Sequence, residues 1–346
     1  MCGVGTVSLA SVRSGCCVAA VSVDLPFSSE RLAAREQAIR RVSHPLPGSV
    51  PLENRRPVNV RAVHDRWRLF DMLIDRFPQV SRAEWQARCD AGRFVHSAGD
   101  VRGKDDRVRA GEQVLQIFPL EVEPRVATDI RILYEDAALI VVGKPAPLPM
   151  HPSGRFRRNT LQHLLNLAYA PVTVRPVHRL DANTTGLVLL GKTRECCRLM
   201  QRQWMVGAVE KAYLVRVAGH PVDDVFFSDA RISARPSVLG TTFIDEAGGR
   251  VSRTDFQVVE RRDDGTSLLE ARLGTGRTNQ IRVHLWDLGH PVVGDPAYLA
   301  ERLLGDTQTL DVDAPPLQLH AWSLAFCHPF SGERLHFTAV RPTWAS

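Results

Sequence analysis

The segment VRPVHRLDANTTGLVLLGKT, residues 174–193, restricts the fold of this chain more than any other stretch. Its first part has the composition of an extended strand, DANTTG is rich in turn-forming residues, and LVLLG is an apolar run of strand length. We therefore expect an extended approach, a sharp turn that opens at Asp181, and a buried strand. A buried strand needs neighbouring strands to satisfy its backbone groups, so the sequence on both sides must supply them.

Short strands and amphipathic helices alternate through residues 126–345, which we expect to form the main domain. The expected strands lie in 129–144 as a pair, in 210–219 and in 268–273. The expected helices are 159–170, 193–205 behind the cap Thr193, and 277–288, ended by Gly289 and Pro291. Strands in hairpins mixed with helices predict an α+β fold rather than a doubly wound parallel sheet.

The N-terminal part of the chain divides near residue 60. Residues 1–60 contain five prolines, and we expect a poorly ordered extension and linker with one short helix near 29–41. Residues 61–122 predict a small α+β module. Its first helix carries Leu69, Met72 and Leu73 at helical spacing, its second is capped by Ser81, and a strand closes it.

Charge, hydropathy and cysteine content limit the classes of partner and ligand. A formal charge of +6 and a pI near 9.1 favour a polyanionic partner weakly. The sequence contains no run of about 18 apolar residues, so we expect no membrane span. The seven cysteines form no CxxC pair, which argues against a disulfide framework or a zinc site and fits a reducing compartment. We expect a cytoplasmic protein, with organellar targeting by residues 1–23 left open.

Asp181 and Arg282 are the side chains best suited to carry chemistry. A carboxyl group with a solution pKa of about 3.9 is ionised at neutral pH and needs no general base to act as a nucleophile. Burial would raise that pKa, so a nearby cation is required. Arg282 lies in a helical segment among Ile281, Val283 and Leu285, and we expect it to pair with Asp181. Taken singly, Asp181 fits a solvated turn and Arg282 fits a structural ion pair.

Other site classes fit the sequence less well. A hydrolytic glycosidase requires two carboxyl groups across the scissile bond, and no second acid is evident beside Asp181. The turn GTGRT lacks phosphate-loop spacing, so we expect no nucleotide cofactor. His284 and His290 are poorly spaced for a metal on one helix, so we expect core or surface histidines and no metal site. The basic loop GRFRRN either meets phosphates or is simply solvated; its arginines are Arg155, Arg157 and Arg158.

Residues 129–344 resemble the RluA group of RNA pseudouridine synthases in several ordered segments. These are LIVVGKPAPLPMHP, HRLDANTTGLVLLGKT, EKAYLVRV, GTGRTNQIRVHLWDLGHPVVGDPAY and LQLHAWSLAFCHPFSGERLHFTA. The sequence departs from the common family form at Asn279, where His is usual, and at Gly143, where Asn is usual. The resemblance implies a mixed, mainly antiparallel sheet with flanking helices and a central RNA-binding cleft.

By this resemblance, Asp181 is the nucleophile and Arg282 its ion-pair partner. Tyr213 stacks on the target base and assists proton removal, and Arg179 fills the space that a flipped uridine leaves. The other substrate-binding positions are His178, Lys211, Arg277 and Ile281. The implied reaction isomerises uridine in RNA to pseudouridine, and it requires no cofactor because no atoms are gained or lost.

Residues 61–122 resemble a divergent alpha-L RNA-binding domain in SRAEWQARCDAGRF and RAGEQVLQI. Arg82, Arg88 and Arg93 are then expected to touch phosphates. A helical face with mixed, solvated charges is the alternative, since residues 65–114 hold ten basic and nine acidic residues.

Three hypotheses follow from the sequence. The first is a monomeric RNA pseudouridine synthase acting on ribosomal or transfer RNA, with an N-terminal module that helps to choose the site. The second is a non-catalytic RNA-binding or RNA-remodelling protein on the same scaffold. The third is a nucleosidase acting on small molecules, which would release free uracil and bind with little dependence on salt.

Overall fold

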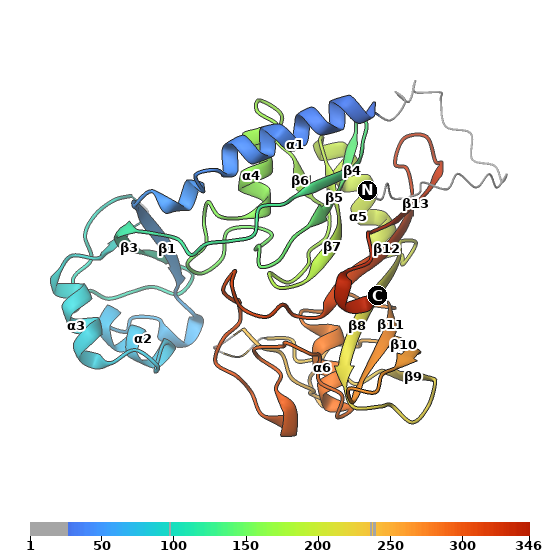
Figure 1. Ribbon diagram of the computed structural model, residues 1–346. Coiled ribbons are helices and arrows are strands. Elements are labelled where there is room, and N and C mark those ends of the chain that lie inside the picture. Colours follow the sequence, from blue (N-terminus) through green and yellow to red (C-terminus); the bar gives the residue numbers. More distant parts are fainter. Residues whose placement is uncertain (1–26, 97, 236, 238–239) are drawn as a thin grey trace. The chain divides into compact units, whose positions relative to one another are not determined.

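The computed structural model describes residues 27–346 except 97, 236, 238 and 239, and the chain forms two compact units (Figure 1). The smaller unit is Gly48–Pro124. The larger unit combines the described residues up to Pro47 with Arg125–Ser346, so the smaller unit interrupts the sequence of the larger one. None of the helices in the described part of the chain is long and apolar enough to cross a bilayer.

The smaller unit packs two helices against a three-stranded antiparallel sheet. Its strands are β1 (Leu52–Asn59), β2 (Phe94–His96) and β3 (Gln113–Glu121), in the order β1-β3-β2. Helix α2 (Leu69–Arg76) buries Leu69, Met72 and Leu73, as its periodicity predicts. Helix α3 (Arg82–Asp90) begins behind Ser81, whose hydroxyl accepts a hydrogen bond from the Glu84 amide at 3.2 Å.

The prediction that residues 1–60 are poorly ordered was wrong for much of residues 27–60, the part of this range that the structure describes. Residues 1–26 lie outside the described residues, but helix α1 (Ser29–Ser43) matches the short helix expected near 29–41. Strand β1 was missed because LENRRPVN contains Pro57 and shows no alternation of apolar residues. Its pairing with β3, about 60 residues further along the chain, makes it a strand.

Within the described residues, the larger unit is built on a ten-stranded sheet in which only β7 and β12 pair in parallel. Its path is β4-β5-β7-β12-β8-β11-β10-β9, with β13 beside β12 and β6 beside β7. The first strands are β4 (Arg131–Glu135), β5 (Leu139–Lys144), β6 (Arg175–Pro176), β7 (Thr185–Gly191) and β8 (Glu210–Ala218). The remaining strands are β9 (Val225–Ser228), β10 (Thr254–Arg261), β11 (Thr266–Leu273), β12 (Leu319–Cys327) and β13 (Arg334–Thr338). This is the mainly antiparallel α+β fold that the sequence predicts.

Helices cover the sheet, and Figure 1 shows α1 running beside α4 and β4. Besides α1, the helices are α4 (Leu161–Ala168), α5 (Arg194–Met205, capped by Thr193) and α6 (Gln280–Asp287). The strand predicted at LVLLG is buried on both faces, because Val188 and Leu190 enter one apolar cluster while Leu187 and Leu189 enter another.

The contact between β7 and β12 fixes the turn that precedes β7. Gly186 pairs with Ala321 at a φ of +112°. A β-carbon built on Gly186 would lie 2.7 Å from the backbone nitrogen of Ala321 and closer still to its carbonyl oxygen. Only glycine allows this close approach of the two strands. The approach places the Asp181 turn at the end of the central strands of the sheet, directly before β7.

Candidate active site

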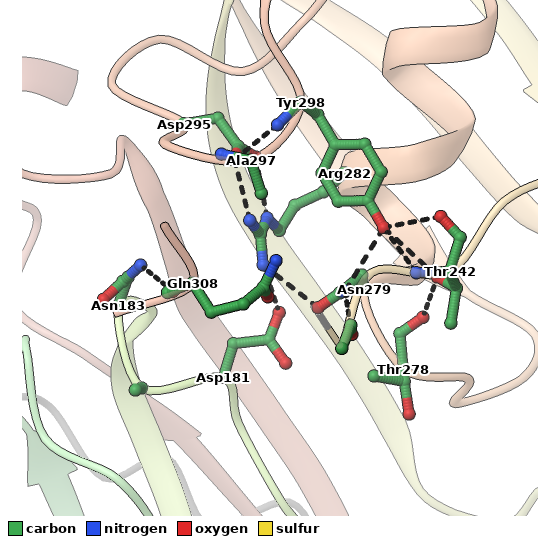
Figure 2. A network of polar contacts seen from close by, with 12 residues as sticks. Asp181, Asn183, Thr242, Thr278, Asn279, Arg282, Asp295, Ala297, Tyr298 and Gln308 are labelled. Atoms are coloured by element: carbon green, nitrogen blue, oxygen red, sulfur yellow. Dashed lines mark hydrogen bonds and ion pairs between the residues drawn. The ribbon is translucent and has the colours of Figure 1, made fainter. Parts of the chain in front are cut away.

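Asp181 and Arg282 meet in the larger unit although they are 101 residues apart (Figure 2). Asp181 opens the turn before β7, and its main-chain carbonyl accepts a hydrogen bond from the Thr184 amide at 3.1 Å. Arg282 lies in α6, and its Nη1 donates to Oδ2 of Asp181 at 3.2 Å. The arginine side chain is 2% exposed and the aspartate side chain 21%, so the carboxylate is partly exposed while its partner is enclosed.

A second carboxylate, that of Asp295, binds two of the three guanidinium nitrogens of Arg282, and the sequence reasoning missed it. Nε and Nη2 of Arg282 donate to the two oxygens of Asp295, each at 2.7 Å. Nη1 also donates to Oδ1 of Asn279 at 3.0 Å. Burial works to lower the pKa of Arg282, but Asp295 and then Asp181 outweigh it and raise that pKa, so the guanidinium stays charged. The sequence held a hint only in the motif VVGDPAY, which contains Asp295.

A cavity of about 410 Å³ opens beside Asp181 and brings most of the predicted site together. Its walls include the predicted catalytic and substrate-binding positions, namely His178, Arg179, Asp181, Lys211, Tyr213, Arg277, Ile281 and Arg282. The volume suits a single nucleotide base and sugar. Apolar side chains, among them Val177, Leu273 and Leu319, form part of the wall.

Tyr213 is a buried residue of β8 in this wall. Burial raises the pKa of its hydroxyl, and the negative charge of Asp181 raises it further. The phenol is therefore protonated at neutral pH, which suits stacking on a base better than proton removal. Lys211, two residues away on the same strand, has a pKa lowered by burial.

A wider cavity of about 810 Å³ also borders the Asp181 turn. It shares Arg179, Asp181 and Arg282 with the first cavity, and it also includes Arg155 of the basic loop. Arg157 is exposed and Arg158 half-buried in that loop. The structure thus brings only Arg155 of the three into the walls beside Asp181.

Two residues, the half-buried His178 and the buried Lys144, hold the Asp181 turn in place. His178 stacks on Trp204 at 4.8 Å between ring centroids, and its Nε2 accepts a hydrogen bond from the Leu189 amide at 3.0 Å. Burial and then Lys211 lower the pKa of His178 to about 3, so its ring is neutral. This histidine anchors the loop rather than offering a charge to substrate.

The other group is Lys144 at the end of β5, a residue the sequence reasoning gave no role. Its Nζ donates to the carbonyls of Pro145, Leu148 and Ala182 at 2.9–3.0 Å. Three acceptors match the three protons of an ammonium group. Burial lowers the pKa of Lys144 to about 7, opposed by the charge of Asp181. Since Ala182 follows Asp181 directly, this lysine fixes the backbone that carries the carboxylate.

The remaining predicted residues have other surroundings. In the smaller unit, the Arg82 guanidinium lies 5.2 Å from the Phe70 ring and that of Arg88 4.9 Å from Trp85. Arg88 also pairs with Glu84. His284 is a core histidine, as expected, with its ring nitrogens 2.9 Å from the Thr254 hydroxyl and 3.1 Å from that of Ser252.

Known proteins resemble this chain in sequence and in fold. The sequence profile of the family described as RNA pseudouridylate synthase matches residues 138–286, a range that includes Asp181, Tyr213 and Arg282. The chain is 39% identical to ribosomal large subunit pseudouridine synthase D of Nitrosomonas europaea, over 80% of this chain and 81% of that protein.

A more distant relative is the mitochondrial tRNA pseudouridine(32) synthase of Saccharomyces cerevisiae. It is 31% identical over 70% of this chain and 53% of that protein. Among solved structures, human RNA pseudouridylate synthase domain containing 1 superimposes with a TM-score of 0.50 at 27% identity. The match covers 64% of this chain and 86% of the human chain.

Proposed function

The chain belongs to the RNA pseudouridine synthases, which are isomerases, and from this premise we propose that Asp181 is its nucleophile. The observation that carries the proposal is the position of this carboxylate. It is partly exposed between two cavities, and among the described residues its carboxylate accepts a hydrogen bond from Arg282 alone. An ionised carboxylate held at one oxygen can attack with the other.

The reaction needs no added atoms. Attack by Asp181 on the ribose or on the base assists cleavage of the bond between the sugar and the base nitrogen. The uracil turns within the cavity of about 410 Å³. Its carbon 5 then joins the sugar as the bond to Asp181 breaks, and the proton lost from carbon 5 is balanced by one taken up at the base nitrogen that left the sugar. Tyr213 stacks on the ring during the turn. Because substrate and product are isomers, the chemistry calls for no cofactor.

A uridine within an RNA helix must leave its stack to enter this cavity, which costs a few kcal/mol. Stacking on an aromatic such as Tyr213 returns about 1–3 kcal/mol of that cost. That Arg179 lines both cavities supports a role in filling the gap in the RNA and in contacting phosphate. Arg155 in the wider cavity is a second phosphate contact.

We further propose a ribosomal or transfer RNA as the substrate, because the similar proteins carry those substrates in their names. One chain supplies Asp181, Tyr213 and Arg282 from a single unit, which supports action as a monomer. The smaller unit binds the same RNA through Arg82 and Arg88, in the manner of an alpha-L domain. A cytoplasmic location fits the bacterial relative, and the mitochondrial relative keeps an organellar one open.

The test compares the wild type with Asp181→Asn on total RNA from cells that lack the protein. Pseudouridine is mapped by carbodiimide adducts and reverse-transcription stops. Asp224→Asn is the matched control, since it removes a carboxylate whose side chain is 77% exposed and which pairs with Arg261 on the surface. New stops with wild type and control alone support the proposal and identify the uridine. Stops that persist with Asp181→Asn would refute the nucleophile, and no stops with folded wild type would favour a non-catalytic RNA-binding role.

A further inference from the structure

We propose that Asp295 is a positioning residue that turns Arg282 so that Asp181 receives one N–H instead of a two-point ion pair. The inference rests on the proposed role of Asp181 as nucleophile. It explains how a buried arginine can hold one oxygen of the reactive carboxylate and leave the other available for attack.

The geometry of the Asp295 pair is that of a fixed fork. Both of its oxygens bind Arg282, at 2.7 Å each, whereas Asp181 has a single contact at 3.2 Å. Two parallel charge-assisted hydrogen bonds are stronger and more directional than one. The Asp295 side chain is 0% exposed, and Oδ1 also accepts the amides of Ala297 and Tyr298 at 2.9 and 3.1 Å. The carboxylate therefore cannot rotate, and it fixes the guanidinium plane.

Asn279 completes the orientation of Nη1. Its Oδ1 accepts from Nη1 at 3.0 Å, and its Nδ2 donates to the hydroxyl of Tyr298 at 3.2 Å (Figure 2). That hydroxyl in turn donates to the carbonyl of Thr242 at 2.7 Å. Nη1 carries two hydrogens, so one is directed to Asn279 and the other to Asp181. Asn279 adopts the left-handed conformation at a φ of +54°, which asparagine tolerates better than most residues.

The charges give this arrangement its consequence. Arg282 carries one positive charge between two carboxylates, and Asp295 is the closer of the two. Without Asp295, the whole charge of a desolvated guanidinium would act on Asp181. Asp181 would then bind Arg282 more tightly and become less reactive toward the substrate.

Two variants that keep the shape of the side chain should shift the acid limb of the pH–rate profile in opposite directions. Asp295→Asn removes a negative charge next to Arg282, so the acid limb of the single-turnover rate should shift to lower pH by about one unit. The rate on the plateau should fall about tenfold or more, with little change in RNA affinity because Asp295 is enclosed. Asn279→Asp adds a negative charge at the Nη1 of Arg282, so its acid limb should shift to higher pH.

Single-turnover pseudouridine formation is measured from pH 4.5 to 8 for both variants, with filter binding for RNA affinity and thermal unfolding for integrity. Asp224→Asn is again the control and should match the wild type. A loss of rate with an unmoved acid limb in both variants would overturn the proposal and leave a merely structural role. If Asp295→Asn does not fold, the Asn279→Asp variant decides by itself. An active wild type and a dead Asp181→Asn enzyme, with both acid limbs unmoved, would overturn this inference alone and leave the proposed function standing.

Discussion

Replacing Gly186 by alanine tests whether the close approach of β7 and β12 fixes the active-site turn. The new β-carbon would lie 2.7 Å from the Ala321 nitrogen, so the two paired strands must separate. The positive φ of +112° adds conformational strain. Strain of this kind costs about 1–2 kcal/mol in a non-glycine residue. Overpacking against a neighbouring backbone adds about 1–3 kcal/mol.

Gly265→Ala is the matched control, because Gly265 also has a positive φ, +79°, but nothing lies within 4 Å of its added β-carbon. The control should lose about 1–2 kcal/mol and Gly186→Ala about 2–5 kcal/mol. In a domain of this size, the difference corresponds to a midpoint roughly 3–10 °C lower in scanning calorimetry. Gly186→Ala should also slow pseudouridine formation more than the control does, since the strand shift displaces Asp181. Equal midpoints for the two variants would refute the view that strand contact fixes this turn.

Three further predictions address the smaller unit, the pH dependence of stability and RNA binding. Ser81→Ala removes the hydroxyl that accepts a hydrogen bond from the Glu84 amide, and it should lower the free energy of unfolding in urea by about 1 kcal/mol. An unchanged urea midpoint would contradict the capping role of Ser81. Burial lowers the pKa of His178 to about 3, so the folded chain binds fewer protons there than the unfolded chain. The contribution of His178 to the free energy of unfolding is therefore complete above about pH 6.5 and falls by about 1.4 kcal/mol per pH unit below it. Replacing this residue, His178→Gln, should flatten the decline in the unfolding midpoint between about pH 6.5 and 5. Arg155→Gln should weaken RNA binding and reduce the salt slope by roughly 0.7–0.9 if it meets one phosphate, and an unchanged slope would remove Arg155 from the RNA interface.

Local sequence determined most of the elements of this protein. Helices α3 and α5 begin behind the caps read at Ser81 and Thr193. The apolar run LVLLG became a strand buried on both faces, and hairpins mixed with helices gave an α+β fold. These features depend on residues a few positions apart, which act on each other in any conformation of the chain. Motif resemblance added the family and its reaction, which the relatives confirm.

Tertiary structure decided what the sequence could not. Strand β1 forms because β3 pairs with it, against the preference of its own polar residues and Pro57. The motif HRLDANTTG pointed to Asp181 and the motif RTNQIRVH to Arg282, but neither indicated that Asp295 binds two nitrogens of the guanidinium. That arrangement depends on where α6 and the following loop place their side chains around one buried charge. A buried charge must be paired by whatever carboxylates the fold brings near, and their distance in space is not written in their separation along the chain.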